Sequence, residues 1–341
     1  MLSDIKILII YNPKAGKGKI KSIMPEVKKM YTKAGLNPLF HATKRRDDAY
    51  ETAGKFVKKY YGNTVVSDRK NSLYVIAAGG DGTLNEVMRG VLDTGYDVPI
   101  GIMPAGSTND FGYSLGLNGG LIDAAEKAMN AILMDECFKC DVATFNGKYI
   151  TYTAAFGLFS DVSYATPQKL KNTFGHAAYL MYGAKNILKT RKVHAEIKYK
   201  GLDEQDGFAI ISDTDDKKID ADLLLGMVVS AKSVGGFRGI TGSGVALDDG
   251  EDELMFVIWP KNPLKLIKTL IHAVGMVRKS PKALKQAYDL TVDHGIKMAK
   301  IKEAKFTFDK PSAWSLDGEE SEAQNEAEIK VIKQAVSYLV L

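Results

Sequence analysis

The chain has 341 residues and a mass of 37.3 kDa, which is long for one domain and favours two. Its hydrophobic fraction of 45%, charged fraction of 26% and net charge of +5 are ordinary for a soluble globular protein. No apolar run approaches the ~20 residues of a membrane span, and the N-terminus lacks the apolar core of a secretory signal. We therefore expect a cytoplasmic protein that has no membrane-spanning segment.

The first buried strand is expected at 5–10, followed by a turn rich in glycine and lysine at 11–19 and a helix to about residue 34. A strand, such a turn and a helix together suggest a phosphate cradle. The Gly-Lys-[Ser/Thr] ending of a P-loop is absent, and lysines at a helix start are also common solvated decoration. A second strand is expected at 39–43, where Thr43 ends the strand and caps the next helix, 47–61.

The run Gly79-Gly80-Asp81-Gly82 follows an apolar stretch, 73–78, that reads as a buried parallel strand. An apolar stripe with helical spacing comes next, so the glycines lie at a strand-to-helix turn. Glycine there permits a positive φ and close approach of a ligand, and the helix N-terminus offers N–H groups to an anion. A carboxylate at Asp81 suits a cation between it and a phosphate. The alternative is a tight turn with a solvated aspartate.

Another strand, 98–104, leads into a turn that carries Gly106, Ser107 and Asn109. Glycine, hydroxyl and amide groups before an amphipathic segment again suit a phosphate site, although helix capping is an alternative role for the asparagine. Alternating strands and helices from 5 to 135 predict a parallel α/β sheet. Ligands of such sheets lie at the carboxyl ends of the strands, so these turns can converge on one nucleotide.

Cys137 and Cys140 form a single Cys-x-x-Cys without a second pair or a nearby histidine, so a zinc site is not expected. The pair also lacks the strand-to-helix context of a redox motif, and two reduced thiols are the simpler interpretation.

From about residue 139 the pattern changes to short strands separated by turns, which predicts an antiparallel, sandwich-like domain. Helical patterns interrupt it at 167–188 and 264–276. The strands are expected at 149–155, 193–199, 207–212, 223–230, 253–258, 304–308 and 314–316.

Residues 164–200 hold eight Lys or Arg against one acid, Glu196, with aromatic residues between them. The plain interpretation is a solvated amphipathic helix. The sharper one is a surface that docks transiently on an anionic membrane, where each basic residue contributes about 1 kcal/mol. Nucleic acid is not an expected partner, because no recognition motif accompanies the patch.

Three turns in this half have plain structural interpretations. Gly235-Gly236 reads as a tight turn, 246–251 as an acidic turn before a strand, and Asp317-Gly318 as a β-hairpin. Asp141 reads as a residue at a strand end.

The motifs also carry a resemblance. Gly-Gly-Asp-Gly-Thr-Leu-Asn-Glu at 79–86 resembles the nucleotide motif of the diacylglycerol kinase catalytic domain superfamily, which includes bacterial lipid kinases and the sphingosine and ceramide kinases. NAD kinases and 6-phosphofructokinases share its shorter core. Asn-Pro-x-Ala-Gly at 12–16, Pro-x-Gly-Ser-x-Asn-Asp-Phe at 104–111, the Asp-Gly tract at 246–251 and Asp-Gly-Glu at 317–319 resemble further motifs of the superfamily in its own order. NAD kinases differ at 104–111.

The resemblance implies roles for individual residues. Glu319 is implied as the proton acceptor, Asp81 as the organiser of catalytic Mg²⁺, and Asp141 as a member of the active-site network. A structural Mg²⁺ is implied at the Asp249 side chain and the carbonyls of Ala246 and Glu251. The implied nucleotide-binding residues are Asn12, Pro13, Lys14, Ala15, Gly16, Thr43, Gly79, Gly80, Asp81, Gly82, Thr83, Leu84, Asn85, Glu86, Gly106, Ser107, Asn109 and Asp317.

These observations predict an ATP- and Mg²⁺-dependent lipid kinase that phosphorylates diacylglycerol to phosphatidate. A nucleotide-binding domain is expected at 1–140 and a β-rich acceptor domain at 141–325, with 326–341 returning to the first. The resemblance implies a homodimer, and a lipid substrate requires visits to the inner face of the membrane. The alternatives are a kinase of another lipid alcohol, such as a sphingoid base, phosphatidylglycerol or a polyprenol, or a non-catalytic, nucleotide-gated lipid-binding protein.

Overall fold

The computed structural model describes residues 2–61, 72–158, 192–201, 217–238, 245–259 and 296–340. The chain divides into two compact units, which we treat separately. Unit 1 comprises Met1–Asp141 and Gln334–Leu341, and unit 2 comprises Val142–Lys333. The helices expected at 167–188 and 264–276, the strand expected at 207–212 and most of the basic stretch at 164–200 lie outside the described residues.

Unit 1 is built on a parallel sheet with the strand order β2-β1-β3-β4. The end of β15 adds a fifth strand beside β4 through the parallel pair Tyr338 and Ile100. All seven residues of β3 are buried, as expected for a central parallel strand covered on both faces. The bounds are β1 Lys6–Tyr11, β2 Leu39–Ala42, β3 Leu73–Gly79, β4 Ile100–Pro104 and β15 Glu319–Tyr338.

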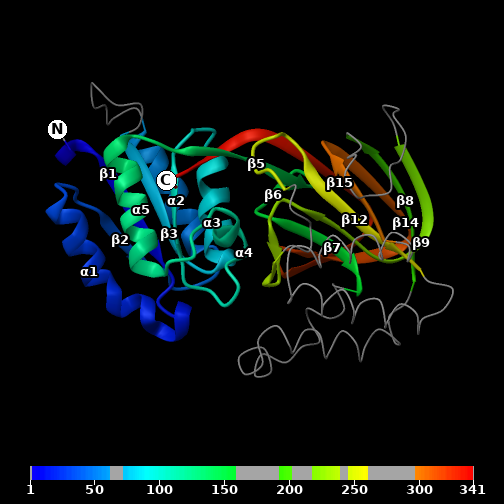
Figure 1. Ribbon diagram of the computed structural model, residues 1–341, viewed down its shortest axis with the longest axis horizontal. Coiled ribbons are helices and arrows are strands. Elements are labelled where there is room, and N and C mark those ends of the chain that lie inside the picture. Colours follow the sequence, from blue (N-terminus) through cyan, green and yellow to red (C-terminus); the bar gives the residue numbers. More distant parts are fainter. Residues whose placement is uncertain are drawn as a thin grey trace, which may run out of the picture. The chain divides into compact units, whose positions relative to one another are not determined.

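Helices cover both faces of this sheet. Figure 1 shows α1 and α5 in front of it, and α2 and α3 pack together on the opposite face. Alternate residues of the strands, such as Ile7 and Ile9 of β1 and Ile76 of β3, form one core with α1 and α5. The helices are η1 Leu2–Asp4, η2 Ala15–Gly18, α1 Lys19–Lys33, α2 Asp48–Tyr60, α3 Asp81–Leu92, α4 Asp110–Ser114 and α5 Leu121–Met134. Within the described residues, no helix is long and apolar enough to cross a membrane.

The expected capping role of Thr43 is wrong. Helix α2 begins at Asp48, and its N-cap position is held by Asp47 in the left-handed region at φ 61°. Thr43 lies four positions before the N-cap, too far along the chain for its hydroxyl to take the place of an N-cap side chain. Thr43 instead donates its backbone N–H to the carbonyl of Tyr11 at 2.9 Å, which ties the end of β2 to the end of β1.

Unit 2 is rich in strands. In its described part, nine strand pairs have a defined register, and all nine are antiparallel. β7 and β8 both lie between β9 and β14. β8 pairs with the first part of each of these long strands, and β7 pairs with the last part. The chain enters the unit within β5 and leaves it within β15. The bounds are β5 Phe138–Phe145, β6 Lys148–Ile150, β7 Thr153–Gly157, β8 Val193–Lys200, β9 Lys217–Val229, β10 Ser233–Val234, β11 Phe237–Arg238, β12 Asp252–Ile258, β13 Ile296–Ile301 and β14 Glu303–Leu316.

An aromatic cluster forms the centre of the unit 2 core. Trp314 is fully buried, and its ring lies 4.8–6.0 Å from the rings of four phenylalanines, in edge-on and tilted contacts. Such geometry is the favourable one for aromatic pairs. The four are Phe145, Phe156, Phe306 and Phe308.

Three strand expectations differ from the structure in unit 2. The strand expected at 223–230 begins earlier, since β9 spans Lys217–Val229. The stretch 149–155 forms two strands, β6 and β7, because the chain between them turns toward another side chain, described below. The stretches 304–308 and 314–316 form one strand, β14, whose register against β15 shifts between Thr307 and Trp314. Irregular pairing of this kind leaves no signal in the hydrophobic pattern.

Candidate active site

The glycine-containing turns of unit 1 meet at the carboxyl ends of its strands. Two backbone hydrogen bonds join the turns directly: the N–H of Asn12 donates to the carbonyl of Ala78 at 3.0 Å, and the N–H of Ala105 donates to that of Gly79 at 2.7 Å. Three separate segments of the sequence therefore form one continuous rim, as expected where parallel strands end at the same edge of a sheet.

Two of the turns touch through bare backbone. A Cβ atom placed on Gly106 would lie 2.7 Å from the Cα of Gly80, and one placed on Gly80 would lie 3.2 Å from the Cα of Gly106. Any side chain at either position would push the turns apart. Neither residue has a positive φ, so close approach, and not a left-handed conformation, explains the glycines here.

Positive φ is the reason for glycine in the first turn. Gly16 has a φ of +59° and Gly18 a φ of +83°. This turn is closed by the side chain of Asn12, whose Oδ1 accepts the N–H of Lys14 at 3.0 Å. Pro13, Lys14 and Ala15 thus lie in a turn that their neighbours hold in place, leading into η2.

Asn109 fixes the turn after β4. Its Oδ1 accepts the N–H of Gly106 at 2.6 Å, and its Nδ2 donates to the carbonyl of the same residue at 2.9 Å. Asn109 itself has a φ of 53°, a conformation that asparagine adopts more readily than most residues. Ser107 is exposed at the tip of this turn. The asparagine side chain therefore fixes the shape of the turn after β4.

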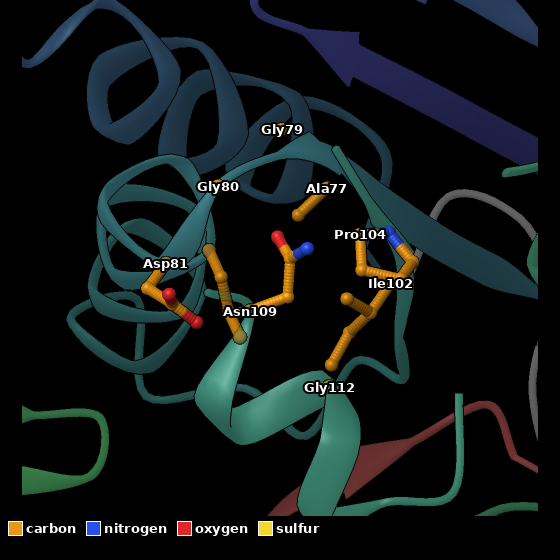
Figure 2. Close-up of a pocket in the computed structure, with 9 residues that line it drawn as sticks. Ala77, Gly79, Gly80, Asp81, Ile102, Pro104, Asn109 and Gly112 are labelled. Atoms are coloured by element: carbon orange, nitrogen blue, oxygen red, sulfur yellow. The ribbon is translucent and has the colours of Figure 1, made fainter. Parts of the chain in front are cut away.

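A small pocket lies within this rim. Figure 2 shows Asn109 in its middle and Asp81 at its edge. Asp81 is the first residue of α3, and its Oδ2 accepts the hydroxyl of Thr108 at 3.1 Å. The pocket is lined by Ala77, Gly79, Gly80, Asp81, Leu84, Ile102, Pro104, Asn109 and Gly112.

Sequence reasoning missed Thr108 as a member of this site. The residue lies between two residues that the motif comparison selected, Ser107 and Asn109, and its hydroxyl links the turn after β4 to the carboxylate of Asp81. A hydroxyl donor oriented at this carboxylate holds one of its oxygens in place. A hydroxyl two residues after a glycine was the signal available in the sequence.

The carboxylate of Glu86 does a structural task within unit 1. Its Oε1 accepts the N–H of Asp47 at 3.0 Å, and its Oε2 accepts the N–H of Ala49 at 3.1 Å. A negative charge that accepts N–H groups at a helix start satisfies donors that the helix leaves unpaired and complements the helix dipole. Glu86 of α3 therefore caps α2. Its implied contact with nucleotide stays a prediction, as do those of Gly82, Thr83, Leu84 and Asn85 in the first turns of α3.

The hairpin expected at Asp317-Gly318 is present. Leu316 pairs with Glu319 across the two-residue turn, and both turn residues have positive φ, 50° and 86°. This is the conformation that favours an Asp-Gly sequence.

The side chain of Asp317 is bound inside unit 2. Its two carboxylate oxygens accept the backbone N–H groups of Thr151, Tyr152 and Thr153 at 2.7, 2.9 and 3.1 Å. This explains the break between β6 and β7. Burial raises the pKa of Asp317, and the three amide donors act against that rise.

The remaining implied catalytic residues lie at strand positions. Glu319 is exposed at the start of β15, directly after this fixed hairpin. Asp141 is buried near the end of unit 1, and its Oδ1 accepts the N–H of Gln334 at 2.7 Å. Gln334 has a φ of 50°, so this bond stabilises an irregular point in β15. The catalytic roles of Glu319 and Asp141 stay predictions.

The acidic turn before β12 contains the implied structural metal site, Ala246, Asp249 and Glu251. Asp249 Oδ1 accepts the N–H of Glu251 at 3.0 Å, and Asp249 Oδ2 lies 2.8 Å from the Nζ of Lys300. Burial and the charge of Asp252 raise the pKa of Glu253 to about 9. Among the described residues, no group of three or more His, Cys, Asp or Glu side chains is arranged to hold a metal ion.

Comparison with known proteins identifies the family. Residues 6–144 match the model of the diacylglycerol kinase catalytic domain. The chain is 32% identical to a diacylglycerol kinase of Staphylococcus haemolyticus over 73% of this chain and 66% of that one. It is 31% identical to the Staphylococcus saprophyticus diacylglycerol kinase over 73% and 72% of the two chains, and 29% identical to the Bacillus subtilis enzyme over the same shares.

Solved structures agree at the level of the fold. A crystal structure of a diacylglycerol kinase from Bacillus anthracis aligns over 98% of this chain and 97% of that one, with a TM-score of 0.65 and 19% identity. A second crystal structure from the same organism gives a TM-score of 0.69 at 21% identity, over 98% and 95% of the two chains. The matched catalytic-domain model together with relatives above 30% identity shows that this chain belongs to the diacylglycerol kinase family and is a lipid kinase.

Proposed function

We propose that this protein transfers the γ-phosphoryl group of ATP to the free hydroxyl of diacylglycerol and so forms phosphatidate. The observation that carries the proposal is the contact of Gly80 with Gly106, beside Asp81 at the start of α3. Because neither position carries a side chain, the two turns lie close together at the start of α3, whose N–H groups can then bind phosphate oxygens. The relatives named as diacylglycerol kinases supply the substrate hypothesis.

The residues of unit 1 fit a nucleotide with a divalent cation. A Cβ at Gly80 or Gly106 would meet the backbone of the other turn and force the two apart, and Asp81 provides a carboxylate oxygen beside them. When bound, ATP supplies the phosphoryl group and Mg²⁺ offsets charge on the phosphates.

Each residue then has a defined task. Asn109 holds the Gly106 turn in shape, and Thr108 orients the carboxylate of Asp81, which attracts the cation that accompanies the phosphates. Glu319 accepts the proton of the lipid hydroxyl, a role open to an exposed carboxylate on the strand that follows a fixed hairpin. Asp317 keeps that hairpin rigid through its bonds to residues 151–153.

The division of labour follows from these tasks. We assign nucleotide binding to unit 1 and acceptance of the lipid to unit 2, with a transient visit to an anionic membrane surface for access to substrate. A homodimer remains part of the proposal through the family resemblance alone.

The test is transfer of labelled γ-phosphate from ATP and Mg²⁺ to a panel of lipid alcohols in mixed micelles. Labelled phosphatidate is the expected product. Label on a sphingoid base, phosphatidylglycerol or a polyprenol would keep the chemistry and replace the substrate. Tight lipid binding without any ATP consumption would refute the proposal in favour of a lipid-binding protein.

The assigned base is tested by Glu319→Gln, with Glu320→Gln as the matched control. Glu320 is the adjacent exposed carboxylate on the same strand, so its side chain points to the other face. Loss of general-base catalysis should lower kcat of Glu319→Gln by about a hundredfold or more while leaving ATP affinity unchanged. Equal turnover of the two variants would remove Glu319 from the mechanism.

A further inference from the structure

A partly buried lysine of a neighbouring strand contacts the acidic turn at 246–251. The ammonium group of Lys300 lies 2.8 Å from Asp249 Oδ2, and its side chain is only 13% exposed. Lysine is seldom buried to this extent unless an opposite charge is bound to it. Lys300 belongs to β13, which pairs with β12 directly after the turn, with Lys300 opposite Glu253.

Both oxygens of Asp249 are engaged. Oδ1 accepts the N–H of Glu251 at 3.0 Å, which closes the turn, and Oδ2 accepts the ammonium of Lys300. Mg²⁺ binds oxygen at about 2.0–2.1 Å and demands a nearly regular octahedron around it. An ammonium group already within hydrogen-bond distance of the same oxygen occupies that space and repels a second cation. The residues present therefore do not fit the structural Mg²⁺ that the family resemblance implies.

The local charge balance points the same way. Three consecutive acids lie where the turn ends and β12 begins, and all are buried: Glu251 at 6%, Asp252 at 1% and Glu253 at 4% exposure. A buried carboxylate that stays ionised needs a nearby cation to offset the cost of leaving water. Lys300 supplies such a cation from the paired strand. Lys302 supplies a second cation, which is exposed and lies 3.9 Å from Glu251.

We infer that Lys300 takes the place of a structural divalent cation in this chain, so that unit 2 folds and keeps its acidic turn without a bound metal ion. Unlike a metal ion, the lysine is part of the chain, and it lies on β13, which pairs with β12. This inference concerns unit 2 alone and holds whichever lipid the enzyme phosphorylates.

Titration of the full chain with Mn²⁺ alone, in the absence of nucleotide, tests the inference, because the free ion is counted directly by its electron paramagnetic resonance signal. The wild type and Asp249→Asn should retain the same amount of Mn²⁺. Thermal unfolding of the wild type, followed by tryptophan fluorescence, should give the same midpoint in Mg²⁺ and in EDTA. Both Trp259 and Trp314 lie in unit 2, so this signal reports the relevant part of the chain.

Lys300→Met removes the ammonium and keeps the length of the side chain. It should gain one Mn²⁺ site at least about tenfold tighter than any in the wild type, since the repelling charge is gone, and Lys300→Met with Asp249→Asn should lose it. Lys302→Met is the matched control, because its ammonium is exposed and does not contact Asp249; it should bind Mn²⁺ as the wild type does.

Two results would overturn the inference. One is a wild-type Mn²⁺ site that Asp249→Asn abolishes, which would show that a metal ion binds despite Lys300. The other is a folded Lys300→Met that gains no site, which would show that the ammonium does not stand at a cation position. If Lys300→Met fails to fold, the comparison of the wild type with Asp249→Asn decides the matter by itself.

Discussion

Replacement of Glu86 by glutamine tests whether this motif residue caps a helix. Its two oxygens accept the N–H groups of Asp47 and Ala49 at 3.0 and 3.1 Å, from a helix that precedes it by about forty residues. Glutamine keeps the shape but has one acceptor oxygen, and its NH₂ group would face the second N–H. One hydrogen bond is lost, one donor is left unpaired, and the negative charge at the helix N-terminus disappears.

The size of the effect follows from these terms. A hydrogen bond to a charged group contributes about 1.5–3 kcal/mol, and a helix N-cap contributes about 0.5–2 kcal/mol. Since the two descriptions overlap, we expect Glu86→Gln to lower the free energy of unfolding of unit 1 by about 2 kcal/mol. With a urea dependence of about 2 kcal/mol per molar, the unfolding midpoint of unit 1 should fall by about 1 M.

Two probes can separate the units. Hydrogen exchange of the backbone amides of α2 and α3 follows unit 1, whereas the fluorescence of the two tryptophans follows unit 2. Glu86→Gln should lower the urea concentration at which the amides of α2 and α3 lose their protection, and should leave the fluorescence transition in place. Glu51→Gln on α2 is the control, because its exposed side chain pairs with Arg45 on the surface and should matter little. Equal midpoints for the two variants would refute the capping role.

Two further predictions concern other contacts. Gly106→Ala places a Cβ 2.7 Å from the Cα of Gly80, and overpacking of this kind costs about 1–3 kcal/mol. ATP affinity measured by calorimetry should therefore fall about tenfold or more. Unchanged affinity would contradict the proposal that these two turns bind the phosphates. The hydrogen bond to Asp222 and nearby aspartate charges raise the pKa of His194 above 6.5, so its stabilising effect is full below the unfolded-state pKa and lost as pH rises through the folded-state value. In urea unfolding followed by tryptophan fluorescence, His194→Gln should therefore destabilise unit 2 more at about pH 6 than at about pH 8.5, and an equal deficit at both would exclude this titration.

The sheet of unit 1 was readable because its signals are local. Buried parallel strands appear as continuous apolar runs, and the stretches 5–10 and 73–78 coincide with β1 and β3 to within one residue at each end. The convergence of the turns needed only the rule that parallel strands end at one edge. The reason why Gly80 and Gly106 are glycines could not be predicted from the sequence. Each must lack a side chain because the backbone of the other, 26 positions away in the sequence, lies against it.

Unit 2 was less readable because its decisive contacts are distant in sequence. β15 begins with a run rich in glutamate, alanine and glutamine, residues that favour helices or solvent, yet it pairs along β14 for most of its length. The break at residues 151–152 depends on Asp317, more than 160 positions away. No periodicity within either segment carries that information, so tertiary pairing overrides local preference there.

The motif residues divide by what their side chains already hold. In three motif residues, two polar side-chain atoms form hydrogen bonds with backbone groups: Asn109, Glu86 and Asp317. Each therefore stabilises a turn or a helix start whether or not nucleotide is present. Substitution of such a residue should lower stability together with activity. A residue that acts on a substrate proton, as proposed for Glu319, should lower activity alone. Stability measured without ligand therefore separates the two groups within one motif set, a distinction that the sequence pattern by itself does not make.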